Sequence, residues 1–160
     1  MIASSLKDSS TSETLTTLLL SKNADPTLTT NTGATALHFA ASKTNLDTAK
    51  KLIEHKASAR VKDKRGQLPL HRAAAVGNVP MVKLLLESRS PVNATDGDGC
   101  TALHHAIAEG HGDTAMVLLK AGAETDKKDN TGALALDLAP DAKVCFDVLT
   151  LVAVKNRVTD

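Results

Sequence analysis

Glycine recurs at a fixed interval of 33 residues along this chain. The four glycines in register are Gly33, Gly66, Gly99 and Gly132. Each opens an alanine- and leucine-rich segment that carries, five residues later, a histidine in the first three copies and an aspartate in the fourth. A regular period of this length is the signature of stacked structural units, each of which contacts only its neighbours. We therefore expect one elongated repeat array rather than a domain built around a single compact core.

The segments that follow these glycines also share their residue types. Residues 101–106 read Thr-Ala-Leu-His-His-Ala, and residues 68–73 read Leu-Pro-Leu-His-Arg-Ala. These segments and the 33-residue period resemble the ankyrin repeat, whose pattern is Thr-Pro-Leu-His-x-Ala. The resemblance implies an all-α solenoid of helix-turn-helix units joined by β-turn tips, with an inner helix after each glycine and an outer helix following it.

In this frame the whole chain, residues 1–160, is a single domain of about four and a half repeats. We expect a partial repeat at residues 1–29, full repeats two to four at 30–62, 63–95 and 96–128, and a C-terminal capping repeat five at 129–160. The outer helices align through Leu19, Leu52, Leu85 and Leu118, which again lie 33 residues apart.

The partial repeat at the start departs from the frame. Residues 1–6 resemble an inner helix without its leading turn, residues 7–13 are interpreted as a polar insertion, and residues 15–20 as the outer helix. A terminal repeat needs a polar outer face or a neighbour that covers its apolar side, and the sequence offers neither here. We therefore expect the chain to be a fragment, or an alternative start, of a longer protein.

Composition excludes several classes of protein. Apolar residues make up 42% of the chain and aromatic residues only 1%, which suits thin layers filled by alanine and leucine. The net charge of +1 gives no basic surface for nucleic acid, and no apolar run is long enough to span a membrane. The start of the chain does not read as a signal peptide, and Cys100 and Cys145 are too few for a disulfide framework. We therefore expect a soluble protein of a reducing, intracellular compartment.

Three histidines, His38, His71 and His104, are the first candidates for catalysis. Their spacing of 33 residues favours a structural role, because a catalytic group has no reason to recur in every unit. In the ankyrin pattern this histidine bonds to backbone atoms across neighbouring turns, and we expect the same here. The sequence has no nucleophile elbow, phosphate-binding loop or paired carboxylates, so we expect neither an enzyme nor a cofactor.

A metal site is the alternative explanation for the histidines. Cys100, His104, His105 and His111 lie close in sequence, but their spacing matches no common zinc pattern. Residues 96–99, Asp-Gly-Asp-Gly, resemble the start of a calcium loop without the glutamate that would complete it. A metal-dependent enzyme that uses these histidines is therefore an alternative hypothesis, and it predicts stoichiometric bound zinc.

The charges of the tips and inner helices point to a binding surface. They are basic in the third repeat, and acidic in the fourth, where we expect Asp96 to be exposed beside two further acids. Solvated surface charge is the plain alternative, but Arg72 and His105 occupy an inner-helix position where ordinary repeats place an apolar residue. We call the predicted protein-binding set the tip surface: Lys62, Lys64, Arg65, Arg72, Asp98, His105 and Glu109.

Residues 62–78, 106–113 and 129–133 resemble the gankyrin family, especially its fungal members. These are seven-repeat ankyrin chaperones that assemble the base of the 19S regulatory particle of the 26S proteasome. The resemblance implies a cytoplasmic and nuclear monomer that binds the C-terminal helical domain of one base ATPase subunit through complementary charges, and no membrane or nucleic acid. This chain is shorter than the family pattern by two or more repeats. The alternatives are an ankyrin adaptor with another protein partner, and a shortened array that binds nothing well.

Overall fold

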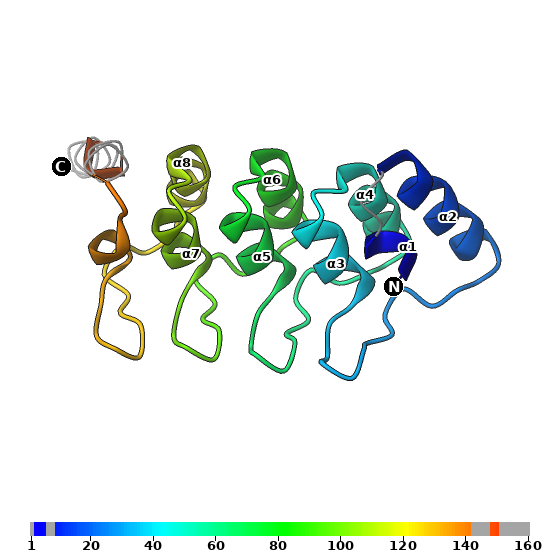
Figure 1. Ribbon diagram of the computed structural model, residues 1–160, viewed down its shortest axis with the longest axis horizontal. Helices are drawn as coiled ribbons and strands as arrows, with labels where there is room; N and C mark the ends of the chain where they lie inside the picture. Colours follow the sequence, from blue (N-terminus) through cyan, green and yellow to red (C-terminus); the bar gives the residue numbers. More distant parts are fainter. Residues whose placement is uncertain (1, 6–8, 142–147, 151–160) are drawn as a thin grey trace.

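The chain folds into a row of helix pairs that follow one another along its longest axis (Figure 1). The computed structural model describes residues 2–5, 9–141 and 148–150. Its α-helices are α1 (Ile2–Ser5), α2 (Ser9–Ser21), α3 (Ala36–Ser42), α4 (Leu46–Glu54), α5 (Pro69–Ala75), α6 (Val79–Glu87), α7 (Ala102–Ala108) and α8 (Gly112–Lys120), and η1 (Ala135–Leu138) is a short 3-10 helix. Within the described residues no sheet is formed, and the predicted all-α array of two-helix units is confirmed. None of the helices described is long and apolar enough to cross a membrane.

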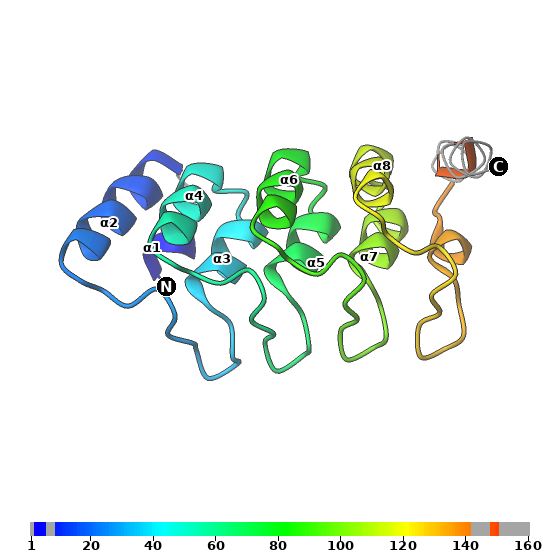
Figure 2. The same ribbon diagram turned by 180° about the vertical axis from the view of Figure 1, so that it is seen from behind.

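The helices form two layers, and a row of loops projects from one side of the array (Figure 2). In the inner layer, next to the loops, α3 packs on α5, α5 on α7, and α7 on η1. In the outer layer α2 packs on α4, α4 on α6, and α6 on α8. Neighbours in sequence are therefore neighbours in space, as expected for a linear array.

Local sequence explains where each helix begins and ends. Pro69 occupies the first turn of α5 and Pro80 that of α6, where the missing N–H removes no helical hydrogen bond. Asn78 caps α6 by accepting a hydrogen bond from the Met81 N–H at 2.9 Å. The residue one place beyond the C-cap of α5, Gly77, has a φ of 73°, a left-handed conformation that stops the helix.

The core is a thin apolar layer between the inner and outer helices. Alanine keeps the layers close together, and leucine fills the space between them. The buried leucines repeat at the period of the chain: Leu37, Leu70 and Leu103 on the inner helices, and Leu52, Leu85 and Leu118 on the outer helices.

The first repeat differs from the prediction. The segment interpreted as an insertion, residues 7–13, is helical from Ser9 onward, so α2 has 13 residues where α4, α6 and α8 have nine. Ser12 anchors the added turn, because its buried hydroxyl donates to the Ala3 carbonyl at 2.6 Å and lies 3.0 Å from the Thr48 hydroxyl. Residues 142–147 and 151–160 of the predicted capping repeat lie outside the described residues.

Candidate functional site

The repeated histidines hydrogen-bond to backbone groups, and His38 in this way connects its inner helix to the repeat that follows. Nδ1 of His38 accepts a hydrogen bond from the Thr35 N–H at 3.1 Å, which leaves Nε2 as the donor to the Gln67 carbonyl at 2.9 Å. Nδ1 of His104 likewise accepts from the Thr101 N–H at 3.3 Å, although its Nε2 makes no hydrogen bond within the described residues. Burial lowers the pKa of both rings, so both are neutral at pH 7.

His71 has the most strongly shifted pKa of the three. Its Nδ1 accepts from the Leu68 N–H and its Nε2 donates to the Ala94 carbonyl, both at 3.0 Å. Burial, with a smaller contribution from His105, lowers the pKa of His71 to about 4. A ring held neutral by two backbone partners is no general base for pH 7 chemistry. The predicted structural role of the repeated histidines is confirmed for His38 and His71.

The tip loops, residues 30–34, 63–67, 96–100 and 129–133, lie against one another, which explains Gly33, Gly66 and Gly99. Gly132 meets no described atom within 4 Å, and its positive φ of 88° accounts for the glycine there. A Cβ on Gly66 would lie 2.8 Å from the backbone nitrogen of Gly97 in the next tip, closer than real contacts allow. Each tip also donates a backbone hydrogen bond to the one before it: Lys64 N to Thr32 O at 2.9 Å, Gly97 N to Arg65 O at 2.8 Å, and Asn130 N to Asp98 O at 3.0 Å.

An aspartate closes each of the last three tips from within. Oδ1 of Asp63 accepts hydrogen bonds from the Arg65 and Gln67 N–H groups, both at 2.9 Å. Asp96, one period later, accepts in the same way from the backbone N–H groups two and four residues on, both at 3.0 Å. Asp129 repeats the arrangement once more. These carboxylates determine the shape of the tips.

The second carboxylate oxygen of two of these aspartates bonds to an inner helix. Arg72 Nη2 donates to Asp63 Oδ2 at 2.6 Å, and His105 Nε2 lies 2.8 Å from Asp96 Oδ2. The Asp63 and Asp96 side chains are only 2% and 1% exposed, whereas those of Arg72 and His105 are 22% and 25% exposed. Burial raises the pKa of each carboxyl, but hydrogen bonds from its helix partner and from the tip backbone outweigh it and leave the pKa below its ordinary value.

The remaining tip-surface residues carry charge outward. The side chains of Lys64, Arg65, Asp98 and Glu109 are exposed and form no ion pair with any residue that the structure describes. Lys62 is also exposed, but its Nζ donates to the Thr95 carbonyl at 2.6 Å.

The structure divides the predicted tip-surface residues into two groups. Arg72 and His105 face buried carboxylates of their own repeats, so much of their hydrogen-bonding capacity is used within the chain. The expectation that Asp96 is an exposed acid is wrong, because the turn backbone and His105 enclose its carboxylate. Sequence reasoning also missed Asp63 as a buried group. The available signal was an aspartate at the 33-residue period with an arginine or a histidine nine residues later.

The structure provides no geometry for the metal-site alternative. Among the residues it describes, no three His, Cys, Asp or Glu side chains are placed to hold a metal ion. Burial, reinforced by the carboxylates of Asp96, Asp129 and Asp98, raises the pKa of the Cys100 thiol to about 11. A protonated thiol is both a poor ligand and a poor nucleophile.

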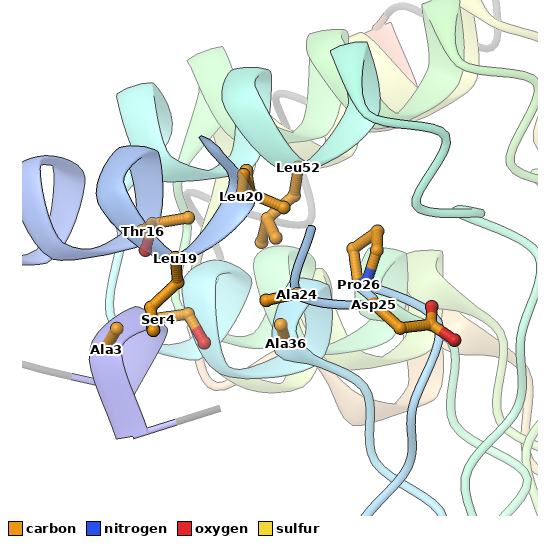
Figure 3. A pocket seen from close by; sticks show the side chains of 10 residues that line it. All are labelled: Ala3, Ser4, Thr16, Leu19, Leu20, Ala24, Asp25, Pro26, Ala36 and Leu52. Carbon is orange, nitrogen blue, oxygen red and sulfur yellow. The ribbon is translucent and has the colours of Figure 1, made fainter. Parts of the chain in front are cut away.

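A small cavity lies at the N-terminal end of the array, between α1, α2 and α3 (Figure 3). Its volume is about 50 Å³, which accommodates a few water molecules rather than a substrate. Among the described residues that line it, Asp25 is the only carboxylate, and it accepts hydrogen bonds from the backbone N–H and hydroxyl of Thr27. The described residues of its lining include no acid–base pair.

Comparison with protein families agrees with this architecture. A family model described as ankyrin repeats (3 copies) matches residues 1–96, 57–129 and 77–157. No curated protein matches the chain by sequence.

Proposed function

This chain belongs to the ankyrin-repeat family, and on that premise we propose that its tip surface binds a partner protein without catalysis. Ankyrin repeats imply a protein-binding module, since stacked repeats present one extended surface to a partner. The observation that carries the proposal is the charge left unpaired on that surface. Lys64 and Arg65 form a cationic tip in the third repeat, and Asp98 and Glu109 supply anionic groups in the fourth.

We propose further that the partner is an ATPase subunit of the proteasome base, which the chain would bind during assembly of the 19S regulatory particle. Support comes from the resemblance of residues 62–78, 106–113 and 129–133 to the gankyrin family. A cationic tip beside an anionic one suits a helical domain with acidic and basic groups in the complementary order. A partner from another protein family could carry the same order of charges, so the fold alone does not identify the partner.

The choice of test residues follows from the ion pairs. Arg72→Glu would place a carboxylate against the buried carboxylate of Asp63, so the change would disturb the tip as well as any contact with a partner. Lys64 and Arg65 are exposed and their side chains hold no described partner. Reversing their charge therefore tests binding with little effect on the fold.

The experiment is a pull-down from a fungal lysate at low salt, with the chain as bait and the captured proteins identified by mass spectrometry. We expect one ATPase subunit of the proteasome base to be recovered by the parent chain and lost with Lys64→Glu/Arg65→Glu. The matched control is Lys83→Glu/Lys120→Glu, which makes the same change of charge on α6 and α8 in the outer layer. Capture of a different protein that also depends on Lys64 and Arg65 would replace the proteasomal assignment by an adaptor role.

A further inference from the structure

Two buried carboxylates each join a tip loop to an inner helix. Asp63 holds the backbone of its tip through Oδ1 and the guanidinium of Arg72 through Oδ2. Asp96 holds its own tip through Oδ1 and approaches the imidazole of His105 through Oδ2. We call these two contacts the tip–helix pairs. They lie in the third and fourth repeats, which also carry the tip surface.

The flanking repeats lack this connection although they have the same tip. In the fifth repeat Asp129 holds the turn through Oδ1, but the helix position nine residues later is Leu138. In the second repeat Thr30 replaces the aspartate and Phe39 stands at the helix position. The tip can therefore form without a helix partner, and the tip–helix pairs are not required for the turn itself.

We propose that Arg72 and His105 are positioning residues, which fix the two central tips against α5 and α7 and so present the charges of Lys64, Arg65 and Asp98 in a preformed arrangement. The proposal rests on the protein-binding role proposed above. Because the Asp63 carboxylate is nearly inaccessible to water, it cannot lose Arg72 without being left short of hydrogen bonds. The equally buried Asp96 would keep, at Oδ2, a long contact of 3.5 Å from Gln67 Nε2 in place of the 2.8 Å contact with His105. The carboxylate then protonates or turns outward, and either movement loosens its bonds to the tip backbone.

Arg72→Leu tests this directly, because the chain itself carries leucine at the equivalent position 138. We expect amide hydrogen exchange at Arg65 and Gln67, which donate to Asp63, to become at least tenfold faster. Exchange at Asp98 and Cys100, which donate to Asp96, should change much less, because Asp96 keeps its own contact with His105. The pKa of the Asp63 carboxyl, followed by NMR, should rise, because burial still acts on it while the guanidinium is gone. Arg72→Lys should restore much of both readouts.

The fourth repeat provides an independent pair of variants. His105→Leu should accelerate exchange at Asp98 and Cys100 in the same way. His105→Arg, which copies the pair of the third repeat, should keep it slow. If Arg72→Leu and His105→Leu leave tip exchange within twofold of the parent and the Asp63 pKa unchanged, the tips do not depend on these residues and the proposal is overturned.

A binding measurement separates this proposal from the proposed partner. The probe is the purified C-terminal domain of a base ATPase subunit, titrated into the folded Arg72→Leu and Arg72→Lys chains. Weaker binding by Arg72→Leu, with recovery in Arg72→Lys, supports positioning for that partner. Loosened tips in a chain whose parent binds no ATPase domain would overturn the proteasomal partner and leave the positioning role in place. Loosened tips with undiminished binding would overturn the functional part of the proposal.

Discussion

At the scale of single residues, Gly77 and Gly110 form a natural comparison. Both follow an inner helix with positive φ, at 73° and 76°. A Cβ on Gly77 would lie 2.5 Å from Nδ1 of His111, whose ring Nε2 lies 3.2 Å from the Ala75 carbonyl. Among the residues that the structure describes, a Cβ on Gly110 would meet only Pro140, at an ordinary 3.5 Å. We predict that Gly110→Ala lowers the free energy of unfolding by about 1–2 kcal/mol through φ alone, and that Gly77→Ala costs a further ~1–3 kcal/mol through overpacking. Urea denaturation of the two variants measures the difference.

A double variant identifies the cause of that difference. In the second repeat the equivalent residue is Thr44, also at positive φ, and the residue equivalent to His111 is Asn78. Gly77→Ala/His111→Asn should therefore recover most of the overpacking cost. Equal destabilisation by Gly77→Ala and Gly110→Ala would show that the imidazole moves aside freely.

The buried imidazole of His71 predicts how stability depends on pH. The unfolded chain protonates this residue near pH 6.5 and the folded chain only near pH 4. Between pH 6.5 and pH 4 the unfolded state binds more protons than the folded state. The stability that His71 contributes is therefore complete above pH 6.5 and is lost as the pH falls toward 4. The loss amounts to roughly 3 kcal/mol at pH 4. Buried carboxylates such as Asp63 act in a lower window, because their unfolded pKa of 3.8 is lowered further by folding.

The measurement is the free energy of unfolding of the parent and His71→Gln from pH 8 to pH 4. The variant should be less stable at pH 8, where it lacks a ring matched to two backbone partners, but it should lose less stability on acidification. His55→Gln is the control for loss of a histidine, since His55 is exposed and its described hydrogen bond goes to the Lys51 carbonyl of α4. Identical slopes for the parent and His71→Gln would mean that folding does not suppress protonation of His71.

At the scale of the elements, the outer helices differ in how completely their neighbours cover them. Leu85 of α6 is 0% exposed, whereas Leu19 of α2, two periods earlier, is 46% exposed. We predict that Leu85→Ala lowers the free energy of unfolding by about 2–5 kcal/mol, and that Leu19→Ala lowers it by less than about 1 kcal/mol. Chemical denaturation tests both predictions. A large loss of stability in Leu19→Ala would contradict them and would show that Leu19 packs against groups other than the described residues.

The elements were predictable to different degrees, for physical reasons. The positions of α3 to α8 follow from the period, because glycine, proline and leucine each act on the local backbone or its nearest layer. The first turn of α2 was not predictable, since serine and threonine favour helix interiors weakly and it depends on the tertiary contacts of Ser12. The tip–helix pairs were missed for a similar reason. They join a turn to a helix nine residues away, and only the packed repeat shows that Asp63 and Asp96 are buried.

At the scale of the whole molecule, the residues that hold the array together differ from the residues proposed to recognise a partner. Alanine, leucine and the repeated histidines hold the layers together, and their roles are visible in the sequence because they recur in successive repeats. The unpaired charges of Lys64, Arg65, Asp98 and Glu109 do not recur. Non-periodic residues on a periodic scaffold are where recognition of one partner can reside, and whether these charges are used depends on a second molecule.

The most direct test of the account is the affinity of a base ATPase C-terminal domain for three chains, measured by isothermal titration calorimetry at low and at moderate salt. The chains are the parent, Lys64→Glu/Arg65→Glu and the outer-layer control Lys83→Glu/Lys120→Glu. We predict that the tip variant binds at least tenfold more weakly, a change of roughly 1.4 kcal/mol. We also predict that the control matches the parent and that salt weakens the parent complex. A tip variant that binds as tightly as the parent would contradict the assignment of binding to the tip surface.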